Sequence, residues 1–213
     1  MSKLRVHIST SLDGFVAGPD QSEENPLGVG GEALHDWAFE LQAFREPHGM
    51  DGGTVNASTP IAVEELANVG AEIMGRGKFG PPGGGPWGAD PWRGWWGERP
   101  PFRKPVFVLT HHERDALTLS DTTFRFVTDG IESALEQARE AAGGKDVIIG
   151  GGADVINQYL AAGLVDEIEL HVVPILLCGG ARLFDDVSPG LRLEQIRAVE
   201  APGVAHLKYR VVT

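Results

Sequence analysis

Short apolar segments separated by turn residues run along the whole chain and predict strands. Most are apolar at successive positions, which is typical of strands that are covered on both faces. We expect strands at residues 3–10, 71–75, 106–110, 124–127, 146–150 and 167–177.

The C-terminal segment, residues 205–212, instead alternates apolar and polar side chains after a turn at Pro202 and Gly203. Alternation with a period of two is typical of a strand with one face in water. Together with residues 193–200, this segment predicts a half-exposed antiparallel hairpin. Its apolar positions are Leu207, Tyr209 and Val211.

Helical periodicity falls between the strands, in stretches that begin near Leu34, Ile131 and Val155. Capping patterns accompany it: Thr59 before Pro60, Asp129 with Glu132, and the glycines Gly143 and Gly163. The pattern predicts an α/β fold with a mixed, mainly parallel sheet of about eight strands, a C-terminal antiparallel hairpin and about four helices. We find no linker, so residues 1–213 are expected to form one domain.

Residues 77–103 resist assignment, because they combine many glycines and prolines with four of the five tryptophans. A loop of this length inside a compact domain is usually functional or disordered, and exposed tryptophans would form a sticky patch. We therefore expect an ordered loop.

Composition and charge narrow the classes of function. The single cysteine, Cys178, excludes an internal disulfide and leaves no cysteine cluster for a metal, so we expect no metal and a cytoplasmic location. The N-terminus lacks the apolar stretch of a signal peptide, and no apolar run is long enough to span a membrane. The net charge of −12 argues against nucleic-acid binding.

Three consecutive glycines, Gly150, Gly151 and Gly152, lie between a buried strand and an amphipathic helix. Glycines let the backbone approach a ligand, and a helix N-terminus attracts phosphate. The motif is a candidate phosphate cradle, although a tight turn without a ligand explains it equally well. It is not the G-x-G-x-x-G fingerprint, because that spacing fails at Val155.

Two further strands end in groups that suit a nucleotide. The strand ending at Gly75 is followed by Arg76 and Lys78, whose charges could hold a 2′-phosphate or simply form a solvated basic turn. Another strand ends in Thr110 and His111.

Together these motifs resemble the dihydrofolate reductase fold: a strand with M-G-R-x-x-F, one with L-T-H, and one with I-G-G-G before a helix. Residues 164–174, 179–184 and 11–18 are similar to one branch of that fold. The branch is the reductase domain of bifunctional riboflavin-biosynthesis deaminase-reductases and its free-standing relatives.

The resemblance implies hydride transfer from NADPH to a C=N or C=O bond of a small, often heteroaromatic, substrate. It places Arg76, Thr110 and His111 at the adenosine end of NADPH, and we expect the neighbouring Gly75 and Lys78 to contact the cofactor as well. It places residues 150–152 at the pyrophosphate, Thr128 near the adenine, and the loop after Ser11, with Ala17, over the nicotinamide.

The proton donor departs from the fold's pattern. Dihydrofolate reductases carry a carboxylate three residues before a tryptophan of the first helix, whereas Leu34 holds that place before Trp37. The nearby Asp36 lies opposite the apolar stripe, which favours a solvated side chain. Asp13 is the other candidate acid, or an ordinary turn residue before glycine.

Aromatic side chains are the candidate substrate contacts: Trp37, Phe79, Trp87 and Trp92. The alternatives are a core position for Trp37, and a self-packed loop or a dimer contact for the loop tryptophans. The terminal hairpin and this loop lead us to expect a homodimer.

Two rival functions stay open. One is reduction of ribosylated aminopyrimidines in riboflavin synthesis, although the chain lacks the H-x-E…P-C-x-x-C zinc motif of the usual neighbouring deaminase. The other is a nucleotide-binding or structural protein that retains the fold without the chemistry.

Overall fold

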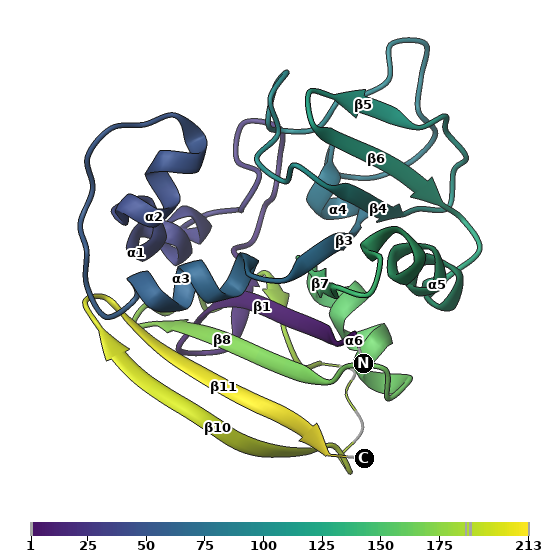
Figure 1. Cartoon of the computed structure of the whole chain (residues 1–213). Helices are drawn as coiled ribbons and strands as arrows, with labels where there is room; N and C mark the ends of the chain where they lie inside the picture. Colours follow the sequence, from purple (N-terminus) through teal and green to yellow (C-terminus); the bar gives the residue numbers. More distant parts are fainter. Residues whose placement is uncertain (1, 186, 188, 213) are drawn as a thin grey trace.

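A large mixed sheet forms the centre of the molecule (Figure 1). The computed structural model describes residues 2–185, 187 and 189–212. Within these residues nine strands follow the order β10-β11-β8-β1-β7-β3-β4-β6-β5, and the strands from β8 to β6 in this order are parallel. Their bounds are Leu4–Ser11 (β1), Val69–Gly75 (β3), Pro105–Leu109 (β4), Leu117–Leu119 (β5), Thr122–Val127 (β6), Asp146–Ile149 (β7), Glu167–Val173 (β8), Arg192–Ala201 (β10) and Val204–Val212 (β11). The expected mixed, mainly parallel sheet is confirmed.

Three short strands were not anticipated. β5 extends the edge of the main sheet, while Phe15–Ala17 (β2) and Ala181–Arg182 (β9) form a separate antiparallel pair. Strands of two or three residues are too short to show a period of two, so their sequences carry no pattern that predicts them.

Helices cover both faces of the sheet (Figure 1). The α-helices are Asp36–Phe39 (α1), Gln42–Arg45 (α2), Thr59–Leu66 (α3), Arg76–Phe79 (α4), Ile131–Ala142 (α5) and Ala153–Ala161 (α6). The 3-10 turns Gly31–His35 (η1) and Glu46–His48 (η2) flank the first two. The helices predicted near Ile131 and Val155 are confirmed.

The continuous helix predicted after Leu34 is wrong. Leu41 adopts an extended conformation with φ −75° and ψ 135°, and it forms a bridge with Thr54. The Gln42 N–H donates to the Thr54 carbonyl at 3.0 Å. This pairing with a distant segment outweighs local helical periodicity and divides the stretch into short turns.

Two capping predictions are also wrong. Helix α3 begins one residue earlier than predicted, since Ser58 is its N-cap and Thr59 lies in the first turn. Helix α5 is preceded by Gly130 at φ 92°, and no side chain caps its N-terminus, so Asp129 and Glu132 form no capping box. The glycines predicted at the C-terminal ends do adopt left-handed conformations, with φ 58° at Gly143 and 66° at Gly163.

Alternate side chains of β1 divide between two different environments. Leu4 and Val6 are fully buried in an apolar cluster with residues of α5 and α6. His7 and Ser9 lie on the other face, where the Trp37 indole N–H donates to Ser9 Oγ at 3.1 Å. One face of the sheet is therefore an apolar core, whereas the other buries polar side chains.

The terminal hairpin differs from its predicted exposure. His206 and Lys208 of β11 are 0% and 8% exposed, whereas Leu207 and Tyr209 are only partly buried. β11 lies between β8 and β10, so its polar side chains face the buried polar side of the sheet. Solvent exposure falls mainly on the edge strand β10.

The tryptophan-rich loop is ordered by its own aromatic side chains. Trp87, Trp92 and Trp96 pack on a second apolar cluster that contains Phe79 and Phe124. The indole N–H groups of the first two donate to backbone carbonyls at 2.9 Å. The loop is therefore packed against side chains of β3, β4 and β6.

No helix in residues 2–185, 187 and 189–212 has the length and apolarity needed to cross a membrane.

Candidate functional site

The carboxyl ends of β3 and β7 meet in a turn built from glycines. The Gly75 N–H donates to the Gly151 carbonyl at 2.9 Å, and the Gly150 N–H donates to the Ile73 carbonyl at 3.0 Å. Gly151 adopts φ +110°, a conformation that side-chain-bearing residues rarely adopt. In parallel sheets, ligands bind beyond these strand ends.

Close packing explains two of the other glycines. A Cβ on Gly150 would lie 2.1 Å from Glu72 Oε1 and 2.4 Å from Lys78 Nζ. A Cβ on Gly75 would lie 2.9 Å from Val155 Cγ2. At Gly75 a Cβ would press on a branched side chain, whereas at Gly150 it would displace the mobile ends of Glu72 and Lys78, so the packing is compatible with both interpretations of the glycine run.

The N-terminus of α6 opens onto the same turn. Gly152 precedes the helix, no side chain caps it, and a Cβ at this position would have no neighbour within 4 Å. Lys78 lies beside it, with Nζ 2.7 Å from the Gly150 carbonyl oxygen and 3.1 Å from Glu72 Oε1. Free N–H groups, the helix dipole and a nearby ammonium group suit a pyrophosphate.

Arg76 is turned toward the tryptophan-rich loop. Its guanidinium donates to the Gly80 and Pro81 carbonyls and stacks on Trp87, 3.8 Å from the ring centroid. Arg114 lies 4.7 Å from the centroid of the same ring. Burial of the Arg76 guanidinium and, to a smaller extent, the charge of Arg114 lower the pKa of Arg76. Two guanidinium groups this close form a local positive region that suits a phosphate. Sequence reasoning missed Arg114, because it lies three residues beyond the L-T-H motif.

Thr110, His111 and Thr128 lie at the ends of the neighbouring strands β4 and β6. The Thr110 N–H donates to the Val127 carbonyl at 3.0 Å, and its Oγ1 accepts from the His112 N–H at 3.2 Å. Thr110 is buried, Thr128 is half-buried and His111 is exposed. Because β3, β4 and β6 are parallel, all three residues lie at the same edge of the sheet as Arg76.

Asp13 holds a turn together. Its carboxylate accepts from Ser11 Oγ at 2.6 Å and from the N–H groups of Leu177 and Cys178 at 3.1 and 2.8 Å. The Ser11 hydrogen bond, followed by these backbone donors, lowers the pKa of Asp13 to about 2. Asp13 is therefore ionised at neutral pH, which favours the turn interpretation over an acid role. Ala17 is buried in β2 just beyond this turn.

The other candidate residues vary in exposure. Asp36 is exposed, as expected for a solvated side chain. Trp37 is 9% exposed with ring centroids of His171 and His206 at 4.7 and 4.9 Å, and Phe79 is fully buried. Trp87 and Trp92 are partly buried in the loop described above.

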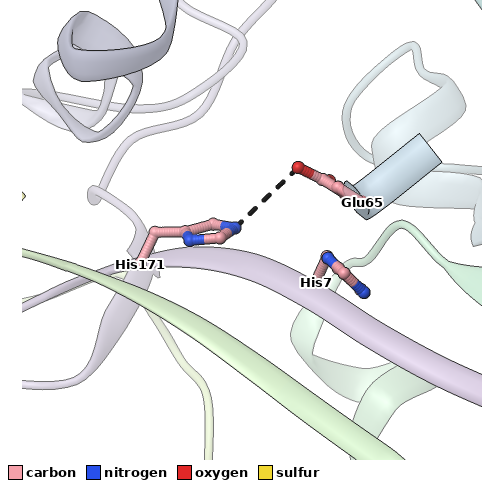
Figure 2. Close-up of side chains that lie close together, drawn as sticks. All are labelled: His7, Glu65 and His171. Atoms are coloured by element: carbon pink, nitrogen blue, oxygen red, sulfur yellow. Dashed lines mark ion pairs between the residues drawn. The ribbon is translucent and has the colours of Figure 1, made fainter. Parts of the chain in front are cut away.

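The sequence did not predict a buried polar cluster on the face of the sheet opposite the apolar core of α5 and α6. His7 (β1), His171 (β8) and Glu65 (α3) come from distant segments and converge there, as Figure 2 shows. Burial lowers the pKa of His7 well below its usual value and that of His171 to about 3, and burial beside Glu169 and Glu72 raises the pKa of Glu65 to about 7. The sequence feature that could have revealed this cluster is the occurrence of polar residues at alternate positions within buried strands.

Comparison with known proteins places the chain in a family. Residues 2–205 match the family described as the RibD C-terminal domain. The chain belongs to this family. The predicted resemblance to the reductase domain of riboflavin-biosynthesis enzymes is thereby confirmed.

One curated relative is YyaP of Bacillus subtilis (strain 168), an uncharacterized protein. The two sequences are 31% identical over 108 residues, which cover 50% of this chain and 54% of YyaP. The match thus spans about half the length of each protein.

Solved structures of similar fold include reductases. A Shewanella sp. PV-4 protein, provisionally described as a riboflavin biosynthesis protein, is 22% identical with a TM-score of 0.64 over 99% of each chain. RibD of Acinetobacter baumannii is 16% identical with a TM-score of 0.57, over 100% of this chain and 59% of RibD. Enterococcus faecalis dihydrofolate reductase, solved with NADP(H), is 14% identical with a TM-score of 0.54, over 99% of this chain and 97% of the reductase. The dihydrofolate-reductase-like fold is therefore confirmed.

Proposed function

We propose that the protein is an NADPH-dependent reductase that transfers hydride to a C=N or C=O bond of a small heteroaromatic substrate. The observation that carries the proposal is the glycine turn at the ends of β3 and β7, which opens onto the uncapped N-terminus of α6 beside Lys78. Membership of the RibD C-terminal domain family supports it.

The residues of this edge fit NADPH. Gly150, Gly151 and Gly152 with α6 would hold the pyrophosphate, and Arg76 with Arg114 would hold the 2′-phosphate. Release of Arg76 from the Gly80 and Pro81 carbonyls would be part of binding, since those bonds occupy its guanidinium in the present conformation. Thr110, His111 and Thr128 would line the adenosine end.

The bound cofactor would supply the hydride, and the protein would fix its position and exclude water. The turn at residues 12–14 is held in place by the bonds from Asp13 to residues 177 and 178. We propose that this rigid turn, with Ala17 behind it, covers the nicotinamide end. The ionised Asp13 carboxylate would act as an anchor in this arrangement.

A second candidate is a nucleotide-binding protein without reductase activity. The state of the two candidate proton donors favours it, since Asp13 is held ionised and Asp36 is exposed. The ionised Asp13 carboxylate therefore has no proton to donate, and the Asp36 side chain is exposed to solvent.

Titration with NADPH and NADH, followed by calorimetry, tests cofactor binding. NADPH oxidation with a panel of pterins, flavins, quinones and a ribosylated aminopyrimidine tests the chemistry. We expect tight NADPH binding and oxidation with at least one compound. Binding without oxidation across the panel would favour the second candidate, and no binding of either cofactor would contradict both.

A further inference from the structure

The buried polar cluster brings together three donors that suit a metal ion. One ligand atom each from His7, His171 and Glu65 lies within 4.8 Å of the other two. His7 and His171 have side chains only 1% and 3% exposed, and Glu65 is 27% exposed. Figure 2 shows Glu65 and His171 directed toward each other across the space above β1.

Two of these donors lack a hydrogen-bond partner. His7 Nδ1 and His171 Nε2 are both buried and unbonded within the described residues. A buried polar atom without a partner is costly, and native structures rarely leave one without a reason. Each has only a long contact with a carboxylate, 4.0 Å from His7 Nδ1 to Glu169 Oε2 and 3.9 Å from His171 Nε2 to Glu65 Oε2, which points to a ligand at this cluster.

The charges around the cluster are paired except at Glu65. Within residues 2–185, 187 and 189–212, five cations lie within 4.0 Å of five carboxylates on this face. The cations are Lys3, Arg5, Lys78, Arg197 and Lys208, and the carboxylates are Glu64, Glu72, Asp146, Glu167 and Glu169. Among the same residues Glu65 has one ionisable partner, His171, at 3.9 Å. Among the described residues, no lysine or arginine therefore pairs with the Glu65 carboxylate within 4.0 Å, although the more distant charges of Lys78 and Arg5 oppose the rise in its pKa.

A hydrogen-bond chain fixes the orientation of His171. His171 Nδ1 lies 2.7 Å from His206 Nδ1, and His206 Nε2 lies 2.8 Å from Ser58 Oγ. If His206 donates to Ser58, then His171 donates to His206 and its Nε2 presents a lone pair toward Glu65. A partner bonded to the second ring nitrogen is what metal-binding histidines require.

We propose that His7, His171 and Glu65 bind a divalent transition-metal ion, of the class of Zn²⁺. Two imidazoles and a carboxylate are a donor set that Zn²⁺ accepts, and three protein ligands leave a fourth position for water or a substrate. The ion would bridge the carboxylate and the two lone pairs, and it would give each unbonded nitrogen a partner.

The spacing of the donors fits this ion after a small contraction. In tetrahedral geometry, ligands about 2 Å from a metal lie about 3.3 Å apart. The 3.9 Å between His171 Nε2 and Glu65 Oε2 exceeds this by less than 1 Å. The widest separation is at most 4.8 Å, so binding would draw the three side chains together.

These three residues could not be recognised as a metal site from the sequence. Residues 7, 65 and 171 lie far apart along the chain, and none belongs to a local metal-binding motif. The expectation of no metal rested on the absence of a cysteine cluster, which does not bear on a site of histidine and glutamate.

Calorimetric titration of the chelator-treated full-length protein with Zn²⁺, and optical titration with Co²⁺, test the site. We expect one equivalent of each ion to bind, and Co²⁺ to show the visible spectrum of four-coordinate geometry. Glu65→Gln should weaken Zn²⁺ binding by more than the about 10- to 100-fold that is typical of losing an outer-shell partner. His171→Gln should do the same, with circular dichroism confirming that both variants fold.

Glu64→Gln is the matched control, because it removes the same charge from the neighbouring position of α3. Glu64 is already bound by Arg197 and Lys208 at 2.5 and 2.6 Å, so its variant should retain the ion. Cys178→Ser controls for binding at the exposed thiol. The proposal is overturned if the wild type binds no ion, if Glu65→Gln binds as the wild type does, or if Glu64→Gln loses as much affinity as Glu65→Gln.

Discussion

The replacement Gly151→Val tests whether the glycine turn holds a phosphate. Gly151 adopts φ +110°, and a Cβ there would lie 3.6 Å from Ile8 Cδ1 and 3.9 Å from Lys78 Cδ, which are ordinary contacts. The protein itself therefore leaves room for the first atom of a side chain, and the cost of valine comes from the backbone conformation. That cost is about 1–3 kcal/mol.

A loss of this size lowers the melting temperature without preventing folding. For a chain of this length, 1 kcal/mol corresponds to about 2–4 °C, so we expect the variant to melt about 2–12 °C below the wild type. NADPH at 100 times its dissociation constant stabilises the wild type by about 2.7 kcal/mol, or roughly 5–10 °C. If the pyrophosphate lies against the backbone of Gly151, the valine side chain blocks it and this shift disappears.

Gly143→Val is the matched control for backbone strain. Gly143 ends α5 at φ +58°, and a Cβ there would meet nothing within 4 Å. This variant should melt lower for the same reason while it retains the full NADPH shift. If Gly151→Val also retains the wild-type shift, the glycine run is structural and the cofactor assignment is wrong.

Three other predictions follow from the structure. Arg76→Ala and Arg114→Ala should each weaken NADPH binding by about 10- to 150-fold, which corresponds to the free energy of a charge-assisted hydrogen bond, and should barely affect NADH binding. Equal losses of affinity for both cofactors in calorimetric titrations would exclude a 2′-phosphate site. The folded-state pKa of Asp13 is lowered to about 2, so its stabilising effect should be complete above about pH 4 and disappear as the pH falls toward 2. Melting curves of the wild type and Asp13→Asn should accordingly converge at low pH, and a constant difference would contradict this account. Light scattering should report a homodimer, and Ile196→Glu on the exposed face of β10 should dissociate this dimer. A monomeric mass for the wild type would contradict the prediction.

The fold could be predicted from the sequence where an element is long and its pattern is strong. Buried strands such as β1 and β3, and helices α5 and α6, follow directly from apolar runs and periodicity. The stretch after Leu34 could not be predicted, because its pairing with Thr54 depends on a segment that is distant in sequence. Strands β2, β5 and β9 depend on their neighbours in the same way.

The candidate site shows the same division. The glycine run and Lys78 lie in short motifs at strand ends, so their position at one edge of the sheet could be predicted from the sequence. The contact of Arg114 with Trp87 depends on how the tryptophan-rich loop folds back, and no local pattern encodes it. The convergence of His7, Glu65 and His171 depends on three separate elements packing together, which only the folded chain reveals.

The shared carboxylate of Glu64 has a consequence for how this sequence can diverge. Glu64 binds Arg197 of β10 and Lys208 of β11, so one side chain of α3 compensates cations on two strands. The network is partly buried, and Arg197 also pairs with Glu169, and Lys208 with Glu167 and Glu169, so loss of Glu64 removes one of several carboxylates around the two cations. Removal of one member of such a network is more costly than joint replacement by apolar residues, which is often neutral. Lys208 is the most sensitive member, since its side chain is only 10% exposed. Across homologues, positions 64, 197 and 208 should therefore covary, changing together far more often than singly.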